Sequence, residues 1–280
     1  MKQIIYTDLD GTLLDFDTYS YQESEGMVKA LQAKGIPLVF CSSKTRAEQE
    51  VYYLALSLSH PIIVENGSAV LIPNGYFDFD ITEIIAQESC HLRPTGSWQA
   101  IVLGVDADEI KTAISQMRTT AGLEVSGYAD LNLADIMRLT SLDEPAARRA
   151  ADRDFSETLL VGKKEGPAWN RFLALLNAGG FQCVSGGKFH TVVGQSSNKG
   201  RAVNILNRLY QYKYDKICTI GLGDSANDLP MLEAVDRPYL VQKHNGSWLH
   251  TNSPRIQKIP AIGPKGWNIV IADLLDDAKN

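Results

Sequence analysis

Cysteine is scarce in this chain of 280 residues, which contains only four. Cys41, Cys90, Cys183 and Cys218 form no C-x-x-C pair and have no spacing typical of a disulfide framework. All but Cys90 lie inside apolar runs, which is typical of buried free thiols in a reducing compartment. We therefore expect a cytoplasmic protein.

Long hydrophobic runs and an excess of basic residues are also missing. No apolar run approaches the ~20 residues needed to cross a bilayer, and the chain enters a strand at Ile4 without a signal-peptide region. The net charge of −6 gives no basic footprint for nucleic acid. We expect neither a membrane nor a nucleic-acid partner, and the sequence leaves the oligomeric state open. An anionic substrate would need local positive charge or a metal ion.

The order of the predicted elements indicates an α/β protein with an insertion. Strands near residues 4–6, 37–41 and 62–65 alternate with helices over 24–34 and from Thr45 onward, which is typical of a parallel sheet. A helix over 200–210, a strand over 216–220 and a strand over 239–242 resume this pattern. The length favours two domains. We predict a Rossmann-like parallel-sheet core from residues 1–82 and 196–280, and an inserted α/β unit from residues 83–195.

Further elements are expected at defined ranges. A hairpin is predicted over 69–79, turning at Asn74 and Gly75. In the insert we expect a strand over 99–105, helices over 107–120, 132–153 and 168–177, a strand over 158–161, and a hairpin over 181–193. These would make a small open-faced sheet with helices on one side.

Two acidic loops follow predicted core strands. Asp8 and Asp10 come directly after the first strand, and Asp224 and Asp228 follow the strand that ends at Ile220. Ligands of open α/β sheets bind at the carboxyl ends of the strands, and nearby carboxylates favour a bound cation. Oxygen ligands from separate loops are typical of Mg²⁺ sites. The glycines around residue 222 also resemble a dinucleotide loop, but two acids there would repel a pyrophosphate.

Two further segments could bind a phosphate group. Ser42 and Ser43 end the second core strand, where hydroxyl and backbone N–H groups can bind phosphoryl oxygens. Lys199 begins a predicted helix, where its charge can offset the charge of a phosphate ester and of carboxylates. Each segment alone has an ordinary explanation, a turn or a solvated lysine.

In this order the four segments resemble the haloacid-dehalogenase-like phosphohydrolases of the Cof-type branch, and the resemblance spans the chain. It implies that the insert is a cap, that Asp8 is the nucleophile and that Asp10 is the general acid and base. Mg²⁺ would be bound by Asp8, the Asp10 carbonyl and Asp224. The phosphoryl group would be held by Ser42, Ser43, Lys199 and Asn227, with Asp228 supporting the site.

A narrower resemblance is to the mannosyl-3-phosphoglycerate phosphatases. It rests on the segments 38–46, 63–70, 138–140, 153–157 and 186–189. It implies a phosphorylated sugar as the small-molecule substrate, contacted by Lys44, Asn66 and Lys188. Lys188 is the candidate to bind the carboxylate of the phosphoglycerate. The alternative is that Lys188 is an ordinary exposed lysine on a strand. A glucosyl-3-phosphoglycerate phosphatase, another sugar-phosphate phosphatase, a phosphomutase and a non-catalytic sugar-phosphate-binding protein stay open.

Overall fold

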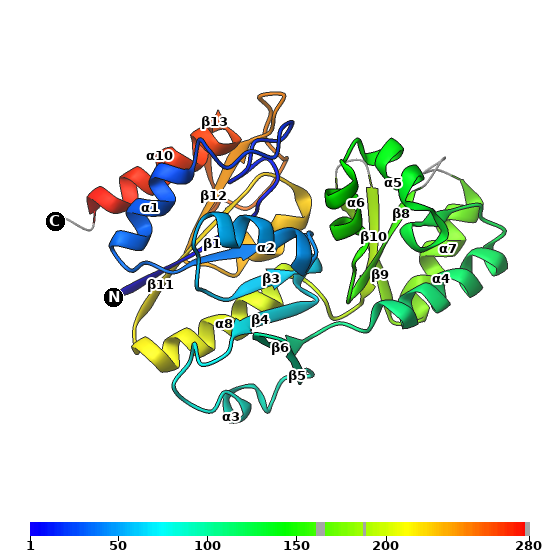
Figure 1. The fold of residues 1–280 in the computed structure, drawn as a ribbon, viewed down its shortest axis with the longest axis horizontal. Helices are drawn as coiled ribbons and strands as arrows, with labels where there is room; N and C mark the ends of the chain where they lie inside the picture. Colours follow the sequence, from blue (N-terminus) through cyan, green and yellow to red (C-terminus); the bar gives the residue numbers. More distant parts are fainter. Residues whose placement is uncertain (161–165, 187–188, 278–280) are drawn as a thin grey trace.

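The computed structural model of the protein describes residues 1–160, 166–186 and 189–277. These residues form two units with separate sheets of nine and four strands (Figure 1). The chain leaves the larger unit after β6 (Trp98–Val102), builds the smaller unit from α4 (Ala107–Ala121) through β10 (Phe189–Gly194), and returns with α8 (Lys199–Tyr214).

Six neighbouring strands of the larger sheet are parallel. In spatial order they are β13 (Gln257–Ile262), β12 (Arg237–Gln242), β11 (Ile217–Gly223), β1 (Lys2–Thr7), β2 (Leu38–Cys41) and β3 (Ile62–Val64). Successive side chains of a strand point to opposite faces, so Ile5 joins one hydrophobic core while Ile4 and Tyr6 join the other. Burial on both faces explains why the inner strands, such as β2 and β3, are continuous apolar runs, whereas the edge strand β13 is mostly exposed. The predicted parallel α/β core is confirmed.

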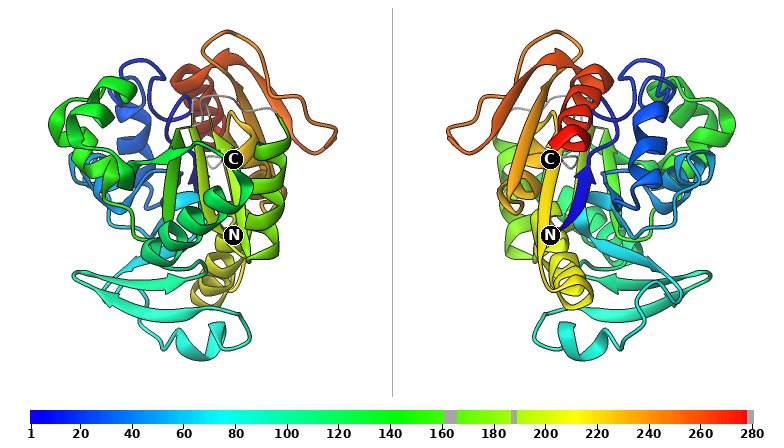
Figure 2. Two further views of the ribbon diagram at one scale, coloured as in Figure 1. Left: turned by 90° about the vertical axis from the view of Figure 1, so that its right-hand side faces the viewer. Right: turned by 90° about the vertical axis from the view of Figure 1, so that its left-hand side faces the viewer.

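Helices cover both faces of this sheet (Figure 2). The core on the side of Ile5 includes residues of α1 (Glu25–Ala33), α2 (Arg46–Ala55) and α10 (Gly263–Asp277). The core on the other side includes residues of α8, α9 (Leu229–Glu233) and α3 (Thr82–Ile85). α2 begins where predicted, with a capping box in which the side chains of Thr45 and Glu48 accept from each other's backbone N–H groups.

Three antiparallel strands extend the larger sheet, in the order β4 (Ala69–Pro73), β6 and β5 (His91–Thr95). We expected residues 91–102 in the insert, which we began at residue 83; this placement was wrong. Trp98 joins the core on one face and Ile101 the core on the other, so β6 is buried on both faces like a central strand.

The predicted hairpin at Asn74 and Gly75 was also wrong. A turn occurs there, with Gly75 at φ +77°, but residues 76–80 form no strand. β4 instead pairs with β3 and β6. Phe77 packs into the core beside Tyr210 of α8, which draws the segment away from the sheet edge.

The smaller sheet is antiparallel, in the order β7 (Ser126–Gly127), β8 (Ser156–Leu160), β10 and β9 (Phe181–Gly186). α4 and α7 (Pro167–Ala178) share a core with β8 and β10, in which Ile110 and Phe172 are fully buried. The predicted pairing of β9 with β10 is confirmed.

The long helix predicted over 132–153 is two helices, α5 (Leu133–Thr140) and α6 (Glu144–Ala151). The helix ends before Ser141, which has φ +61°. A new helix, α6, begins after Asp143, whose side chain accepts a hydrogen bond from the N–H of Ala146. Pro145 fits only the first turn of such a helix. The edge strand β13, which contains Pro260, was not predicted.

All four cysteines are free, but only Cys41 is buried; Cys183 and Cys218 are partly exposed, contrary to expectation. No helix among the described residues is both long and apolar enough to span a membrane.

Candidate active site

The two acidic loops meet at the carboxyl ends of adjacent strands, as predicted. β1 and β11 pair in parallel with Thr7 opposite Leu222, and the N–H of Asp8 donates to the carbonyl of Leu222 over 2.9 Å. Asp8 and Asp224 therefore leave the sheet side by side. One carboxylate oxygen from each of Asp8, Asp224 and Asp228 lies within 4.8 Å of the others, and all three residues are buried.

Lys199 reaches into this group from the first residue of α8. Its Nζ lies 2.7 Å from Oδ1 of Asp8 and 2.6 Å from Oδ1 of Asp228, and the side chain is fully buried. Asn198 caps the helix by accepting from the N–H of Arg201, which fixes where the helix begins. One ammonium faces three carboxylates, so the group keeps an excess of negative charge.

Asp228 also holds the loop after β11 in shape. Its Oδ2 accepts hydrogen bonds from the N–H groups of Asp224 (3.1 Å) and Ser225 (3.0 Å). A Cβ on Gly223 would lie 2.6 Å from Cβ of Asp228, so only glycine fits there. These bonds agree with the supporting role predicted for Asp228, and the carboxylate also belongs to the acidic group.

Asp10 points to a different partner. Its Oδ1 lies 3.1 Å from Nζ of Lys44, and that lysine also lies 3.6 Å from a carboxylate oxygen of Glu48. The ring of Tyr19 covers the same ammonium at 4.7 Å from its centroid. The carboxylate of Asp10 is thus outside the acidic group, and metal binding by its carbonyl stays a prediction.

Burial and mutual repulsion raise the pKa values of the acids. Burial raises the pKa of Asp8 well above its ordinary value, Asp228 raises it further, and Lys199 opposes both. Burial and Asp228 raise the pKa of Asp224 to about 7. Burial raises the pKa of Asp10 against the opposing charge of Lys44. Burial disfavours the charged form of Lys199, but Asp228 and Asp8 outweigh it and raise the pKa of its ammonium.

The donors present fit a Mg²⁺ ion. Buried carboxylates held within 4.8 Å of one another repel, and a bound cation relieves that repulsion. Mg²⁺ prefers hard oxygen ligands and keeps waters or substrate oxygens in its remaining positions. Asp8 and Asp224 come from different loops and are therefore suitable ligands.

The predicted phosphate-binding residues lie beside this group. Ser42 is buried at the end of β2, and its carbonyl accepts from the N–H of Asn66 over 3.0 Å. Oδ1 of Asn66 accepts from Nδ2 of Asn227 over 3.1 Å, which links the loop after β3 to the loop after β11. A Cβ on Gly67 would lie 2.3 Å from the backbone of Asn198, so a glycine lets this loop support the start of α8.

Two predicted residues have no contact with the acidic group in the part of the chain that the structure describes. Ser43 follows Ser42, and its carbonyl accepts from Nη1 of Arg153 at 3.5 Å. Lys188 lies outside the described residues, so its substrate role stays a prediction.

Sequence reasoning missed Glu65 and Arg153. Glu65 has φ +47° and Asn66 φ +60°, in a region that side chains seldom adopt. The segment around Arg153 contributed to the resemblance, but the sequence does not show how the smaller unit packs on the larger one. The position of Arg153 near Ser43 could therefore not be predicted.

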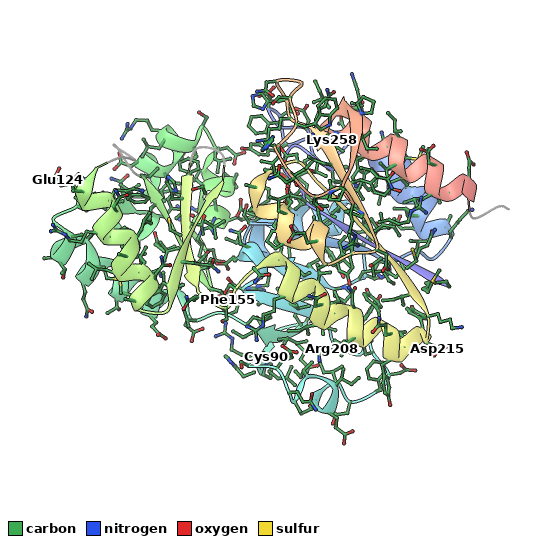
Figure 3. All side chains as sticks on the ribbon, turned by 180° about the vertical axis from the view of Figure 1, so that it is seen from behind. Cys90, Glu124, Phe155, Arg208, Asp215 and Lys258 are labelled. Atoms are coloured by element: carbon green, nitrogen blue, oxygen red, sulfur yellow. The ribbon has the colours of Figure 1, made fainter. Side chains whose placement is uncertain are left out.

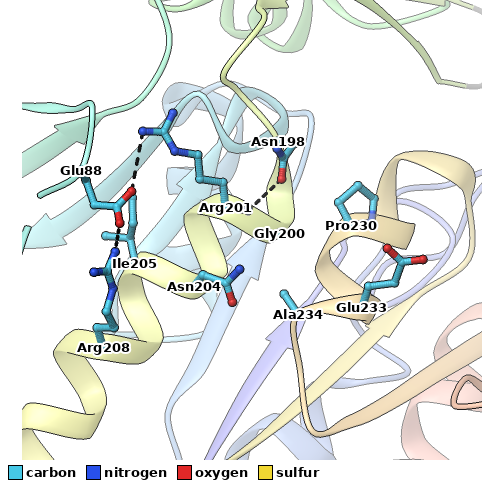
Figure 4. A pocket seen from close by; sticks show the side chains of 10 residues that line it. All are labelled: Glu88, Asn198, Gly200, Arg201, Asn204, Ile205, Arg208, Pro230, Glu233 and Ala234. Atoms are coloured by element: carbon cyan, nitrogen blue, oxygen red, sulfur yellow. Dashed lines mark hydrogen bonds and ion pairs between the residues drawn. The ribbon is translucent and has the colours of Figure 1, made fainter.

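A cavity of about 470 Å³ lies between α8 and α9 (Figure 4). It is lined by Asn204, Glu233 and the ion-paired Glu88, Arg201 and Arg208, among others. None of the clustered carboxylates lines it, so we do not place the chemistry there.

Comparison with known proteins gives consistent results. Residues 5–89 and 174–247 match the family model of haloacid dehalogenase-like hydrolases. The chain is 38% identical, over 100% of both chains, to a glucosyl-3-phosphoglycerate/mannosyl-3-phosphoglycerate phosphatase of Methanococcoides burtonii. It is 35% identical to a mannosyl-3-phosphoglycerate phosphatase of Pyrococcus furiosus, over 94% of this chain and 98% of that one.

Among solved structures, the fold is similar to the sucrose-phosphatase from Synechocystis in complex with sucrose and phosphate. The TM-score is 0.59 at 16% identity, covering 99% of each chain. A protein from Thermoplasma acidophilum gives a TM-score of 0.66 at 16% identity, covering 98% of this chain and 99% of that one.

Proposed function

The chain belongs to the haloacid dehalogenase-like hydrolase family and is a phosphatase, and we propose that it hydrolyses mannosyl-3-phosphoglycerate to mannosylglycerate and phosphate. The observation that carries the chemistry is the group of Asp8, Asp224 and Asp228 around Lys199. The substrate is supported by the names of relatives that cover nearly the whole chain. Glucosyl-3-phosphoglycerate is the second candidate, because the relative from Methanococcoides burtonii is named for both.

In the first step, an oxygen of Asp8 attacks phosphorus and the bond from phosphorus to the leaving oxygen breaks. Asp8 becomes an aspartyl phosphate, and a protonated Asp10 gives its proton to the leaving alkoxide. The raised pKa of Asp10 favours the protonated form that this step needs. Lys199 lies 2.7 Å from Asp8 and can also offset the charge of the phosphoryl oxygens.

In the second step, Asp10 as a carboxylate takes a proton from water while the water oxygen attacks phosphorus. The bond between phosphorus and Asp8 breaks, which releases phosphate and restores the carboxylate. Such acid–base assistance contributes roughly 10²–10⁴-fold. Ser42 and Asn227 would hold the phosphoryl oxygens, and Ser43 is a further candidate.

The proposed cofactor is Mg²⁺, held by Asp8, the carbonyl of Asp10 and Asp224, with Asp228 as support. When bound, it would neutralise charge on the phosphoryl oxygens. We assign this chemistry to the larger unit as catalytic core, and substrate selection to the smaller unit as cap. Free cysteines are compatible with a cytoplasmic location.

A phosphate-release panel tests this function in Mg²⁺-containing buffer. Mannosyl- and glucosyl-3-phosphoglycerate are compared with mannose and glucose phosphates and with sucrose phosphate. The proposal expects kcat/KM to be highest for the mannosyl substrate. Preference for a hexose phosphate without glycerate would contradict the assigned substrate, whereas turnover only with a bisphosphate activator would indicate a phosphomutase.

A further inference from the structure

One corner of the smaller unit is docked on the loop that follows β2. Oγ1 of Thr45 donates to the carbonyl of Arg149 over 2.8 Å, and Nη1 of Arg153 lies 3.5 Å from the carbonyl of Ser43. Phe155 is buried in the hydrophobic core of the larger unit, at the junction seen in Figure 3. The corner between α6 and β8 therefore lies beside the residues that follow Ser42.

Glu65 fixes the backbone of this corner. Its carboxylate accepts from the N–H groups of Asp154 (2.9 Å) and Phe155 (3.1 Å) and from the hydroxyl of Ser156. The same hydroxyl oxygen accepts from Nη1 of Arg153 over 2.8 Å. A buried acid of the larger unit thus sets the position of the Arg153 guanidinium through Ser156.

The protein uses only one end of that guanidinium. Both hydrogen bonds of Arg153 come from Nη1, and its Nε is covered yet has no hydrogen-bond partner among the described residues. Among the described residues, Arg153 forms no salt bridge within 4.0 Å, although its side chain is partly buried. Lys44, by contrast, is already paired with Asp10 and Glu48. The charge of Arg153 acts at longer range on Glu65 and Glu157, where it opposes the rise that burial causes in their pKa values, but neither acid forms a salt bridge with it.

We propose that Arg153, through Nη2, which makes no hydrogen bond among the described residues, binds the carboxylate of the phosphoglycerate part of the substrate. This inference rests on the proposed function. A guanidinium N–H group forms a short, charge-assisted hydrogen bond with a carboxylate. In a 3-phosphoglycerate ester the carboxylate is separated from the phosphate-bearing carbon by a single carbon. A cation next to the loop of Ser42 and Ser43 is thus suitably placed for it.

Inhibition of a small artificial ester separates the carboxylate from the sugar. With para-nitrophenyl phosphate as substrate and Mg²⁺ present, we compare inhibition by 3-phosphoglycerate and by glycerol 3-phosphate, which lacks the carboxylate. Wild type should prefer 3-phosphoglycerate, and Arg153→Ala should reduce that preference roughly ten- to a hundredfold. Arg153→Lys keeps the charge without the fork and should retain part of it.

The matched control is Arg148→Ala. Arg148 carries the same charge on the same corner but is exposed and paired with Glu144, so the preference should not change. Equal weakening of both inhibitors in Arg153→Ala would give Arg153 a purely structural role. If Lys188→Ala loses the preference for 3-phosphoglycerate and Arg153→Ala keeps it, the carboxylate is bound by Lys188 and not by Arg153. Either result overturns the proposal.

The substrate panel separates this proposal from the proposed function. If wild type hydrolyses mannosyl-3-phosphoglycerate but shows no preference for 3-phosphoglycerate, the Arg153 site is wrong and the function stands. If the preference exists and depends on Arg153 while no phosphoglycerate-linked sugar is hydrolysed, the assigned substrate is wrong and the site stands. Circular dichroism of each variant checks that it is folded.

Discussion

Asp8 and Glu65 are both buried carboxylates at the ends of parallel strands, but their surroundings differ. Asp8, at the end of β1, faces two more carboxylates and one ammonium. Glu65, just after β3, receives two backbone N–H groups and one hydroxyl from the smaller unit. Burial raises the pKa of both, and near Asp8 the repulsion of Asp228 adds to it.

The difference separates a site for chemistry from a site for attachment. Around Asp8, the excess negative charge is left for a metal ion and a phosphoryl group to compensate. Around Glu65, the protein itself supplies the donors that replace water, so the carboxylate joins the two units. Burial of an acid alone therefore does not identify a catalytic residue; the identity of its partners does.

Replacing Asp8 should have the largest effect. Asp8→Asn keeps the shape of the side chain but removes the nucleophile, so kcat should fall on the order of 10⁴–10⁶-fold. In Asp10→Asn, kcat should fall less, by about 10²–10⁴-fold, because this change removes only acid–base assistance. Phosphate release and circular dichroism are measured together. A folded Asp8→Asn protein with activity within tenfold of wild type would contradict the nucleophile assignment.

Removing a metal ligand should come next. Chelation should stop activity, and added Mg²⁺ should restore it. Asp224→Ala should raise the Mg²⁺ concentration needed for half-maximal activity by on the order of a hundredfold, because it removes a direct ligand. Asp108→Ala removes the same charge from an exposed position of the smaller unit and is the control. Unchanged Mg²⁺ dependence in Asp224→Ala would exclude this ligand.

The acidic site was predictable because its residues follow apolar strands. In a parallel sheet, the carboxyl ends of all strands share one edge, so local motifs locate Asp8, Ser42 and Asp224 together. The motif indicated that Lys199 offsets the charge of carboxylates, but which carboxylates it contacts, Asp8 and Asp228, depends on where α8 begins.

The Glu65 site could not be predicted in this way. Its donors lie about ninety residues away, on a corner whose position depends on how the smaller unit packs. The same limit explains the misplaced β5 and β6. The strand predicted over 99–105 has an ordinary strand pattern, and only the pairing of β6 with β4 assigns it to the larger sheet; β5 was not predicted and joins that sheet by pairing with β6.

Removing the Glu65 carboxylate should weaken the attachment of the smaller unit. Glu65→Ala leaves three donors without an acceptor, and each buried donor costs ~1–3 kcal/mol, so we expect a loss of roughly 3 kcal/mol or more in the free energy of unfolding. Hydrogen exchange of the amides of Asp154 and Phe155 should accelerate in the same variant. Glu83→Ala, at an exposed position of the larger unit, is the control. Unchanged exchange at both amides would contradict the attachment role.

The smallest effect should be a change in the pH dependence of stability. Burial raises the pKa of Glu65, although Arg153 and the donors oppose this. A carboxyl group with a raised folded pKa stabilises the protein fully below the ordinary glutamate pKa of about 4.3, and this contribution is lost as the pH rises through the folded value. Wild type should therefore lose stability relative to Glu65→Gln as the pH rises above about 4, by at most about 1.4 kcal/mol per pH unit. Urea unfolding of both proteins across this range measures the difference, with Glu83→Gln as the control. A wild-type advantage that grows with pH would mean that the donors outweigh burial and lower the pKa of Glu65, which would contradict the rise in pKa assigned to both Glu65 and Asp8.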